Sequence, residues 1–145
     1  MLREILEQLF EFAAKTFPSN QILEAKKAYQ KETGEIYEDD NSYNSRMALF
    51  LEWYLFDNYN LEKSQTTLEI IIENFFKFLS IEKYEIYKSF TKNNIQGIFI
   101  VKKIKNESVK VINLFTDDPY LVQEKDSRLF FRKNDIFQGR LLFFQ

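Results

Sequence analysis

The chain has 145 residues and a formal net charge of −2, and 45% of its residues are hydrophobic. This length and composition indicate one compact domain or two small ones, and they exclude a largely disordered chain. The sequence contains no Cys and no His, which excludes disulfides, zinc–thiolate sites and Ser-His-Asp or Cys-His catalysis within this chain. No segment has the pattern of a signal peptide or a membrane span, so we expect a soluble cytoplasmic protein.

Apolar residues recur at three- and four-residue spacing over the first ninety residues, which predicts a series of helices. Pro18 ends the first helix, and Gly34 ends the second because glycine tolerates the positive φ of a helix C-terminus. A helix that begins at Thr66 or Thr67 is apolar around most of its circumference, so we expect it in the middle of the helical core. The expected helices span about residues 2–16, 22–33, 42–57, 66–79 and 80–91.

The periodicity changes after Asn94, where β-branched and aromatic residues alternate with polar ones. The expected strands span residues 97–104, 108–115, 120–124, 129–131 and 136–144. Five short strands with tight connections are typical of a small antiparallel barrel or curled sheet of SH3-like size. We therefore predict an α+β protein with an amino-terminal bundle of four to five helices, residues 1–92. We expect this bundle to pack on a five-stranded small barrel, residues 95–145, and both regions to unfold as one cooperative unit.

The first candidate site surrounds residues 50–57, which hold the only tryptophan. At about 100° per residue, Phe50, Trp53 and Asp57 share one helix face, which indicates a packing hub. The polar residues near it in sequence are Asp39, Asp40, Arg46, Glu52 and Asp57. Carboxylates can bind Mg²⁺ or Ca²⁺, but the sequence contains no EF-hand pattern and no glycine-rich nucleotide loop. The sequence favours the alternative, in which these residues cap helices and form ion pairs.

The second candidate site is the basic half of the chain. Residues 1–80 carry eight Lys/Arg against fourteen Asp/Glu, whereas residues 81–145 carry twelve against eight. The basic residues of interest are Lys102, Lys103, Lys105, Lys110, Arg128, Arg132, Lys133 and Arg140. The aromatic residues interleaved with them are Phe99, Phe115, Tyr120, Phe130 and Phe131. Such residues can stack bases and pair with phosphates, although no nucleic-acid-binding motif appears and most of these aromatics are needed for a barrel core.

The third candidate site is apolar. Residues 75–79 and 141–144 contain more large apolar side chains than two small cores require. Either the helices and the barrel bury all of them, or some remain as a patch for a partner or a second copy. The strand that ends at Phe144 can also leave an unprotected edge that pairs with another chain.

Several short blocks of the sequence together resemble a family of uncharacterised bacterial proteins. The first blocks are Thr33-Gly34, Glu38-Asp39-Asp40, Tyr43, Arg46-Met47, Phe50 and Glu52-Trp53-Tyr54-Leu55-Phe56-Asp57. The later blocks are Thr66-Thr67-Leu68, Ser80, and residues 134–136 with 139–141. The resemblance covers residue 25 to the end, and relatives continue past the last strand. No activity is established for this family, so the resemblance implies the fold and adds no catalytic residue.

These observations favour a non-enzymatic cytoplasmic interaction or adaptor module that binds a protein partner and needs no cofactor. The alternative is nucleic-acid or nucleotide binding through the basic face of the β region, and the third hypothesis is a carboxylate-based, metal-dependent enzyme. Self-association into a homo-oligomer also fits the apolar excess. The residues predicted to bind are Arg46, Glu52, Trp53, Asp57, Lys102, Lys103, Arg128, Arg132, Lys133 and Arg140.

Overall fold

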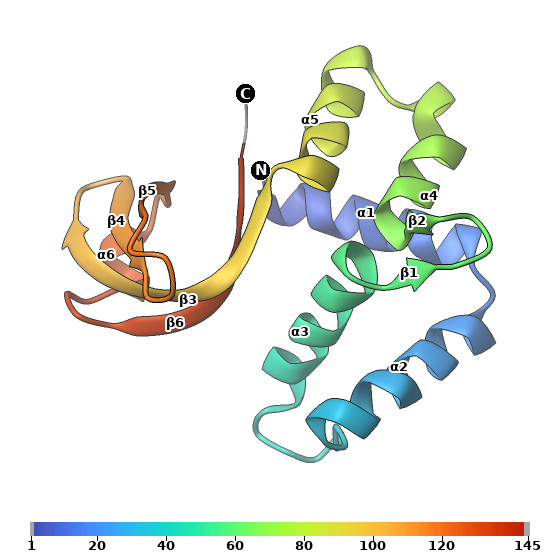
Figure 1. Cartoon of the computed structure of the whole chain (residues 1–145), viewed down its shortest axis with the longest axis horizontal. Coiled ribbons are helices and arrows are strands. Elements are labelled where there is room, and N and C mark those ends of the chain that lie inside the picture. The colour runs from blue at the N-terminus through green and yellow to red at the C-terminus, as the bar shows by residue number, and fades with distance from the viewer. Residues whose placement is uncertain (1, 144–145) are drawn as a thin grey trace. The chain divides into compact units, whose positions relative to one another are not determined.

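The computed structural model describes residues 2–143, with side chains from residue 4 onward. The chain divides into a helical unit, Met1–Thr91, and a β unit, Lys92–Gln145 (Figure 1). The two units together form an α+β protein, as predicted. No helix in the described residues is long and apolar enough to cross a membrane.

In its described residues the helical unit contains five α-helices, a short two-stranded hairpin and one 3₁₀ turn. Its elements are α1 (Leu2–Thr16), α2 (Ser19–Thr33), α3 (Tyr43–Phe56), β1 (Tyr59–Asn60), β2 (Gln65–Thr66), α4 (Thr67–Phe75), η1 (Phe76–Phe78) and α5 (Ile81–Lys92). These bounds confirm the five helices predicted from the apolar spacing, with α4 shorter than expected.

The two helix ends predicted from Pro18 and Gly34 are confirmed. Pro18 directly precedes α2, where its missing N–H costs no helical hydrogen bond. Gly34 follows α2 with φ of 92°, and its N–H donates to the carbonyl of Gln30 at 2.9 Å. A residue with a side chain would be strained at this φ, so glycine fits this position.

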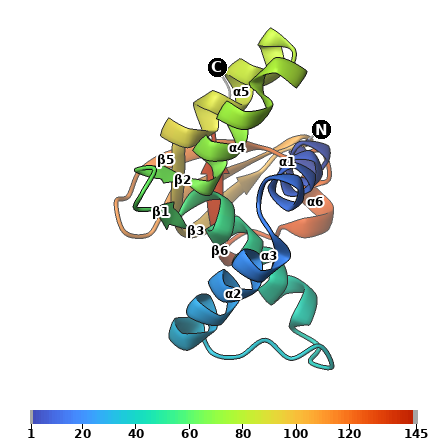
Figure 2. The same ribbon diagram turned by 90° about the vertical axis from the view of Figure 1, so that its right-hand side faces the viewer.

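Helix α4 lies in the middle of the helical core, as predicted. Five of its residues are buried, and the helix contacts both α1 and α3 (Figures 1 and 2). Thr66 and Glu69 form a capping box at its start: the Thr66 hydroxyl accepts the Glu69 N–H at 3.3 Å, and the Glu69 carboxylate accepts the Thr66 N–H at 2.8 Å. After Phe75 the helix tightens into η1, which turns the chain toward α5.

The hairpin of β1 and β2 is not predicted by the sequence pattern. Its strands have two residues each, with Tyr59 opposite Thr66 and Asn60 opposite Gln65. Local side chains hold it: the Asn60 Oδ1 accepts the Lys63 N–H at 2.9 Å, and the Asn58 amide donates to the Thr67 hydroxyl at 3.1 Å. Strands this short contain no periodicity to detect.

The described residues of the β unit form an open antiparallel sheet of four strands in the order β5–β4–β3–β6. Its elements are β3 (Asn94–Ile104), β4 (Ser108–Asn113), β5 (Pro119–Gln123), α6 (Ser127–Phe130) and β6 (Ile136–Leu142). The predicted five-stranded small barrel is therefore wrong, because the sheet has four strands and does not close. In the described residues β5 and β6 are opposite edges of the sheet, and the long strand β3 bends along its length with β6 beside it (Figure 1).

The sheet does not close because the fourth predicted strand, residues 129–131, does not form. This segment belongs to the helical turn α6 and its end, because the Phe131 N–H donates to the Ser127 carbonyl at 2.9 Å. The buried Ser127 hydroxyl donates to the carbonyl of Lys105 at 2.6 Å and fixes the turn against the β3–β4 connection. The backbone donors of this segment are thus used in a helical turn and cannot pair two strands.

One face of the sheet forms the core of the β unit. Its buried centre is Phe99, Val101, Val109 and Val111. Partly buried apolar residues pack around that centre: Ile95, Ile104, Tyr120, Val122, Phe131, Phe137 and Leu141. A turn at residues 133–135 joins α6 to β6, with Asn134 at φ 71° and its N–H donating to the Val101 carbonyl at 2.8 Å.

Candidate functional site

The aromatic hub predicted at residues 50–57 is a packing cluster within the helical unit. The Tyr29 ring of α2 lies 5.2 Å from the Trp53 ring and 5.5 Å from the Phe50 ring. Phe50 and Tyr54 are buried, and burial raises the pKa of the Tyr54 hydroxyl. Trp53 is half-buried, so it joins the cluster but leaves part of its indole at the surface.

Arg46 serves as the link between α2 and α3. Its guanidinium donates to the carbonyl oxygens of Gly34 at 2.7 Å and Thr33 at 3.3 Å, and to that of Glu35. The last carbonyls of a helix have no partner within the helix, so an arginine here satisfies several acceptors at once. The structure therefore gives Arg46 a structural role in closing the end of α2.

The other polar residues of the first candidate site do not converge with Arg46. Arg46 lies near the start of α3 and Asp57 directly follows its last residue, which separates them by roughly 16 Å along the helix axis. Glu52 lies between them and is half-buried. Within the described part of the chain, no three or more carboxylates lie close enough together to hold a metal ion.

Asp39 and Asp40 lie in the exposed connection before α3. The Asp40 Oδ1 accepts the Ser42 N–H at 2.9 Å. This backbone hydrogen bond, with a second one from the Ser42 side chain, lowers the pKa of the Asp40 carboxyl below its ordinary value. Asp40 thus holds the turn that precedes α3 and does not cap the helix, because the N-cap residue is Ser42 and α3 has no side-chain capping hydrogen bond.

The basic residues of the β unit follow a simple pattern. Its four strands contain no Asp or Glu, and all six acidic residues of the unit lie in the connections between elements. Four basic residues lie on the strands: Lys102, Lys103, Lys110 and Arg140. Lys103 of β3 is directly opposite Lys110 of β4, and both are exposed. Two like charges in this position repel each other, so an anion bound here would be favourable.

The remaining predicted basic residues are more scattered. Arg128 is exposed on α6, and Arg132 and Lys133 are exposed in the turn before β6. Arg140 is half-buried on β6, and its Nη1 donates to the Asn94 side-chain oxygen at 2.6 Å. The sequence therefore finds the basic side chains, and the fold distributes them over a sheet face, a helical turn and a loop.

The aromatic partners expected for these basic residues are mostly in the core. Phe99 is fully buried, and Tyr120 and Phe131 pack against it. Only Phe115 and Phe130 of the five are exposed, and both lie outside the strands. Most of these aromatics therefore belong to the core, as the sequence also indicated, because inward alternation along β3 takes Phe99 to the core. Aliphatic residues occupy the other sheet face, where Ile100 is opposite both Ile112 and Ile136.

The apolar excess at residues 75–79 remains partly exposed. Phe76 is 51% exposed, Phe78 is 79% exposed, and Ile81 at the start of α5 is 83% exposed. We call these three residues the elbow patch. Ile81 is absent from the sequence prediction, although its position away from the buried Tyr87 and Phe90 stripe of α5 is a signal that could have revealed it.

The two aromatic residues of the elbow patch, Phe76 and Phe78, make ring contacts within the helical unit. Phe75 stacks on Phe12 of α1 with ring centroids 4.2 Å apart, and the Phe78 ring lies 6.2 Å from Phe75. The Phe76 ring meets the edge of Tyr84 at 6.2 Å. The Ser80 hydroxyl also accepts the Lys83 N–H at 3.2 Å, which fixes the start of α5. The exposed rings therefore have defined positions on an ordered turn.

The second apolar segment, residues 141–144, behaves differently. Leu141, Leu142 and Phe143 are half-buried, and the Phe143 ring lies 5.8 Å from Tyr120. Phe144 lies outside the described residues. This segment contributes to the core of the β unit, and we find no exposed patch on its described residues.

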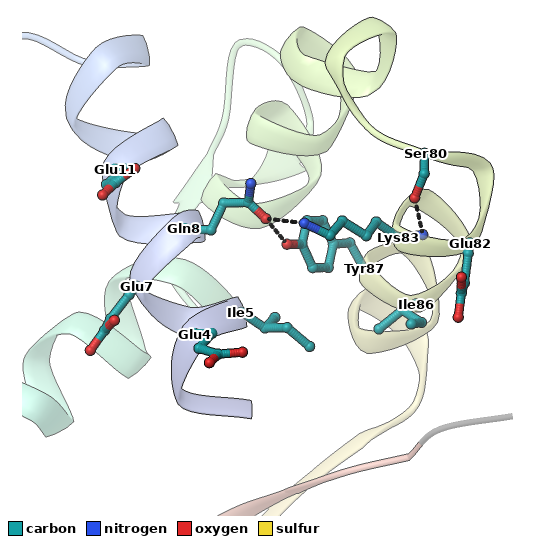
Figure 3. A pocket seen from close by; sticks show the side chains of 10 residues that line it. All are labelled: Glu4, Ile5, Glu7, Gln8, Glu11, Ser80, Glu82, Lys83, Ile86 and Tyr87. Carbon is teal, nitrogen blue, oxygen red and sulfur yellow. Dashed lines mark hydrogen bonds between the residues drawn. The ribbon is translucent and has the colours of Figure 1, made fainter. Parts of the chain in front are cut away.

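A groove of about 490 Å³ lies between α1 and α5 in the helical unit. Figure 3 shows Lys83 and Tyr87 of α5 pointing toward Gln8 of α1. The Gln8 Oε1 accepts the Tyr87 hydroxyl and lies 3.5 Å from the Lys83 Nζ. The acidic residues that line the groove are Glu4, Glu7, Glu11 and Glu82. Lys83 and Tyr87 are thus both hydrogen-bonded to Gln8, and this network links α1 to α5.

Comparisons with known proteins add no assignment to these surfaces. No protein-family model, no curated protein and no solved structure matches this chain.

Proposed function

We propose that this chain is a non-enzymatic, cytoplasmic interaction module that binds a protein partner through the elbow patch. The observation that carries this proposal is the exposure of three large apolar side chains on an ordered turn, with Phe78 at 79% and Ile81 at 83%. Together the three residues present apolar surface on the order of 400 Å². That area suits the apolar centre of an interface, surrounded by a polar rim.

The ordered rings also favour binding over incidental exposure. Aromatic anchors dominate the binding energy of many interfaces, and a side chain that is already fixed loses little conformational entropy on binding. Phe76 is held by Tyr84 and Phe78 by Phe75 before any partner arrives. The fitting partner is a protein with an apolar pocket or groove that accepts Phe78 and Ile81.

The test compares two variants with equally exposed side chains. Phe78→Ser removes the centre of the elbow patch, whereas Leu129→Ser removes an apolar side chain of α6 that is also 79% exposed. Tagged wild type and both variants are used to capture partners from the source cells, followed by quantitative mass spectrometry. We expect one partner to be lost with Phe78→Ser and retained with Leu129→Ser.

Two results would contradict the proposal. One is a partner set that Phe78→Ser and Ile81→Ser leave unchanged, and the other is loss of partners with Leu129→Ser alone. Thermal unfolding of each variant provides the folding control, because exposed side chains contribute little to the core and the melting temperatures should stay close to wild type.

Nucleic-acid binding is the second candidate, and the Lys103–Lys110 pair favours it. Because the four strands contain no acidic residue, the charged residues on the Lys103–Lys110 face of the sheet are all basic. Fluorescence anisotropy with short RNA and DNA at low and high salt tests the idea. Binding that weakens with salt and with Lys110→Gln, while Lys125→Gln in an exposed turn has little effect, would support this candidate.

A further inference from the structure

The edge of the sheet formed by β6 has backbone groups that face away from β3. Two backbone hydrogen bonds at opposite ends of the β3–β6 ladder define the pattern. The Phe143 N–H donates to the backbone carbonyl of Asn93 at 3.1 Å, and the Val101 N–H donates to the backbone carbonyl of Asp135 at 2.8 Å. In an antiparallel ladder such bonded pairs recur every second residue. The odd-numbered residues of β6 therefore bond β3, and the N–H and C=O groups of Ile136 and Gln138 point outward.

The opposite edge, β5, is protected. The Asn113 N–H donates to the backbone carbonyl of Asp118, and the Glu124 N–H donates to the backbone carbonyl of Glu107, both at 3.0 Å. The same alternation then makes Pro119 one of the outward-facing residues of β5, and proline has no N–H to offer. Strand β5 is also short, with five residues. Proline and short length are two ways in which proteins prevent pairing at a sheet edge.

Strand β6 lacks these protections. It has seven residues, and it contains no proline and no acidic residue. Arg140 is its one charged residue. A long edge of this kind is a template for another strand.

We propose that β6 pairs antiparallel with β6 of a second copy, about a two-fold axis at Gly139. In this register all seven residues find a partner, and the pairs are matched in character: Gln138 opposite Arg140, Phe137 opposite Leu141, and Ile136 opposite Leu142. Gly139 lies opposite itself as a non-hydrogen-bonded pair, where the chains approach to about 4.5 Å and glycine fits well.

Two alternative registers are worse. An axis at Arg140 places this residue opposite its own copy, which sets two like charges against each other. An axis between two residues pairs the core face of one strand with the outer face of the other, because side chains alternate along a strand. The symmetric pairing also closes on itself, and the remaining β5 edges are blocked by Pro119, so assembly stops at a dimer.

Introducing a negative or a positive charge at Gln138 tests this register. Gln138 is exposed and lies opposite Ile98 in its own sheet, so a charge here meets no charged residue directly opposite within the chain. In the dimer it meets Arg140 of the second copy at two symmetric positions. We expect Gln138→Glu to lower the dimer dissociation constant by roughly 2- to 30-fold and Gln138→Lys to raise it by a similar factor, with both effects reduced by salt.

The measurement is sedimentation equilibrium of the full chain over a concentration series, with amide hydrogen exchange at low and high concentration. The Gln138 N–H should become protected as dimer forms, whereas the Phe137 N–H should be protected at both concentrations. A chain that stays monomeric at every soluble concentration would overturn the proposal. A dimer with equal affinity in both Gln138 variants, or one that only Phe78→Ser abolishes, would overturn it as well and place the contact elsewhere.

Discussion

The helical unit and the β unit use their charged residues differently. The helical unit carries ten Lys/Arg against sixteen Asp/Glu, and several of the residues singled out from its sequence hold helix ends or connections in place, as Arg46 and Asp40 do. The β unit carries ten against six, and its acidic residues are confined to connections while basic ones lie on the strands. Arg46 and Asp40 therefore support the fold of the helical unit, whereas Lys103 and Lys110 form an exposed basic pair in the β unit.

The apolar residues show the reverse contrast. In the helical unit the elbow patch remains outside although α4 directly before it is the most buried helix segment. In the β unit the final apolar segment contributes to the core through Phe143 and Leu141. A run of large apolar residues thus indicates burial only when the element that carries it has a face turned to a neighbour.

The largest expected effects come from the centre of each core. Phe50 and Phe99 are almost fully buried, in the helical and β units respectively. We expect Phe50→Ala and Phe99→Ala each to lower the free energy of unfolding by about 3–5 kcal/mol, because each leaves a cavity. Chemical denaturation monitored by the fluorescence of Trp53, the only tryptophan, measures the helical unit directly.

The same two variants test the prediction of one cooperative unit. If the units unfold together, Phe99→Ala shifts the Trp53 transition as Phe50→Ala does. A Trp53 transition that Phe99→Ala leaves unchanged would show that the units unfold separately, and amide exchange in β3 would then report the loss in the β unit.

Trp53→Ala should have a smaller effect than a buried aromatic. Its ring contacts Tyr29 and Phe50 but is only half-buried, so we expect a loss of about 2 kcal/mol. Thermal or chemical unfolding followed by far-UV circular dichroism measures this, because the variant has no tryptophan signal. A loss as large as that of Phe50→Ala would show that the indole is buried in solution.

Arg46→Lys tests whether the helical unit depends on a capping arginine. A lysine keeps the charge but cannot reach several carbonyls in the fixed geometry of a guanidinium. We expect a loss of about 1–2 kcal/mol in the free energy of unfolding and faster amide exchange at the end of α2. If amide exchange at the end of α2 is unchanged in this variant, Arg46 has no structural role there and becomes a candidate binding residue again.

The smallest effect is expected from Asp40, and it depends on pH. The Ser42 hydrogen bonds lower the pKa of Asp40 in the folded state below its ordinary value of 3.8. Its contribution to stability is therefore present above that value and is lost as the pH falls through the folded-state pKa. The melting temperature of Asp40→Asn should therefore fall slightly less than that of the wild type between neutral and acidic pH. An identical pH profile would show that the hydrogen bond contributes nothing measurable.

Local signals in the sequence determined the helices and their ends. The spacing of apolar residues located α1 to α5, Pro18 marked the end of α1, Gly34 marked the end of α2, and Thr66 or Thr67 marked the start of α4. These features could be predicted because they depend on residues within one or two helical turns of each other. The alternating pattern located β3 to β6 for the same reason, apart from segment 129–131.

Only the tertiary structure decided which of these residues face solvent and how the sheet is organised. A three-residue segment such as 129–131 reads equally well as strand or helix, and its helical turn leaves the sheet open with β6 at an edge. Phe99 and Phe130 have similar sequence surroundings, yet one is buried and the other is 65% exposed. Burial and strand order depend on contacts between residues far apart in the chain, and no local pattern specifies those contacts.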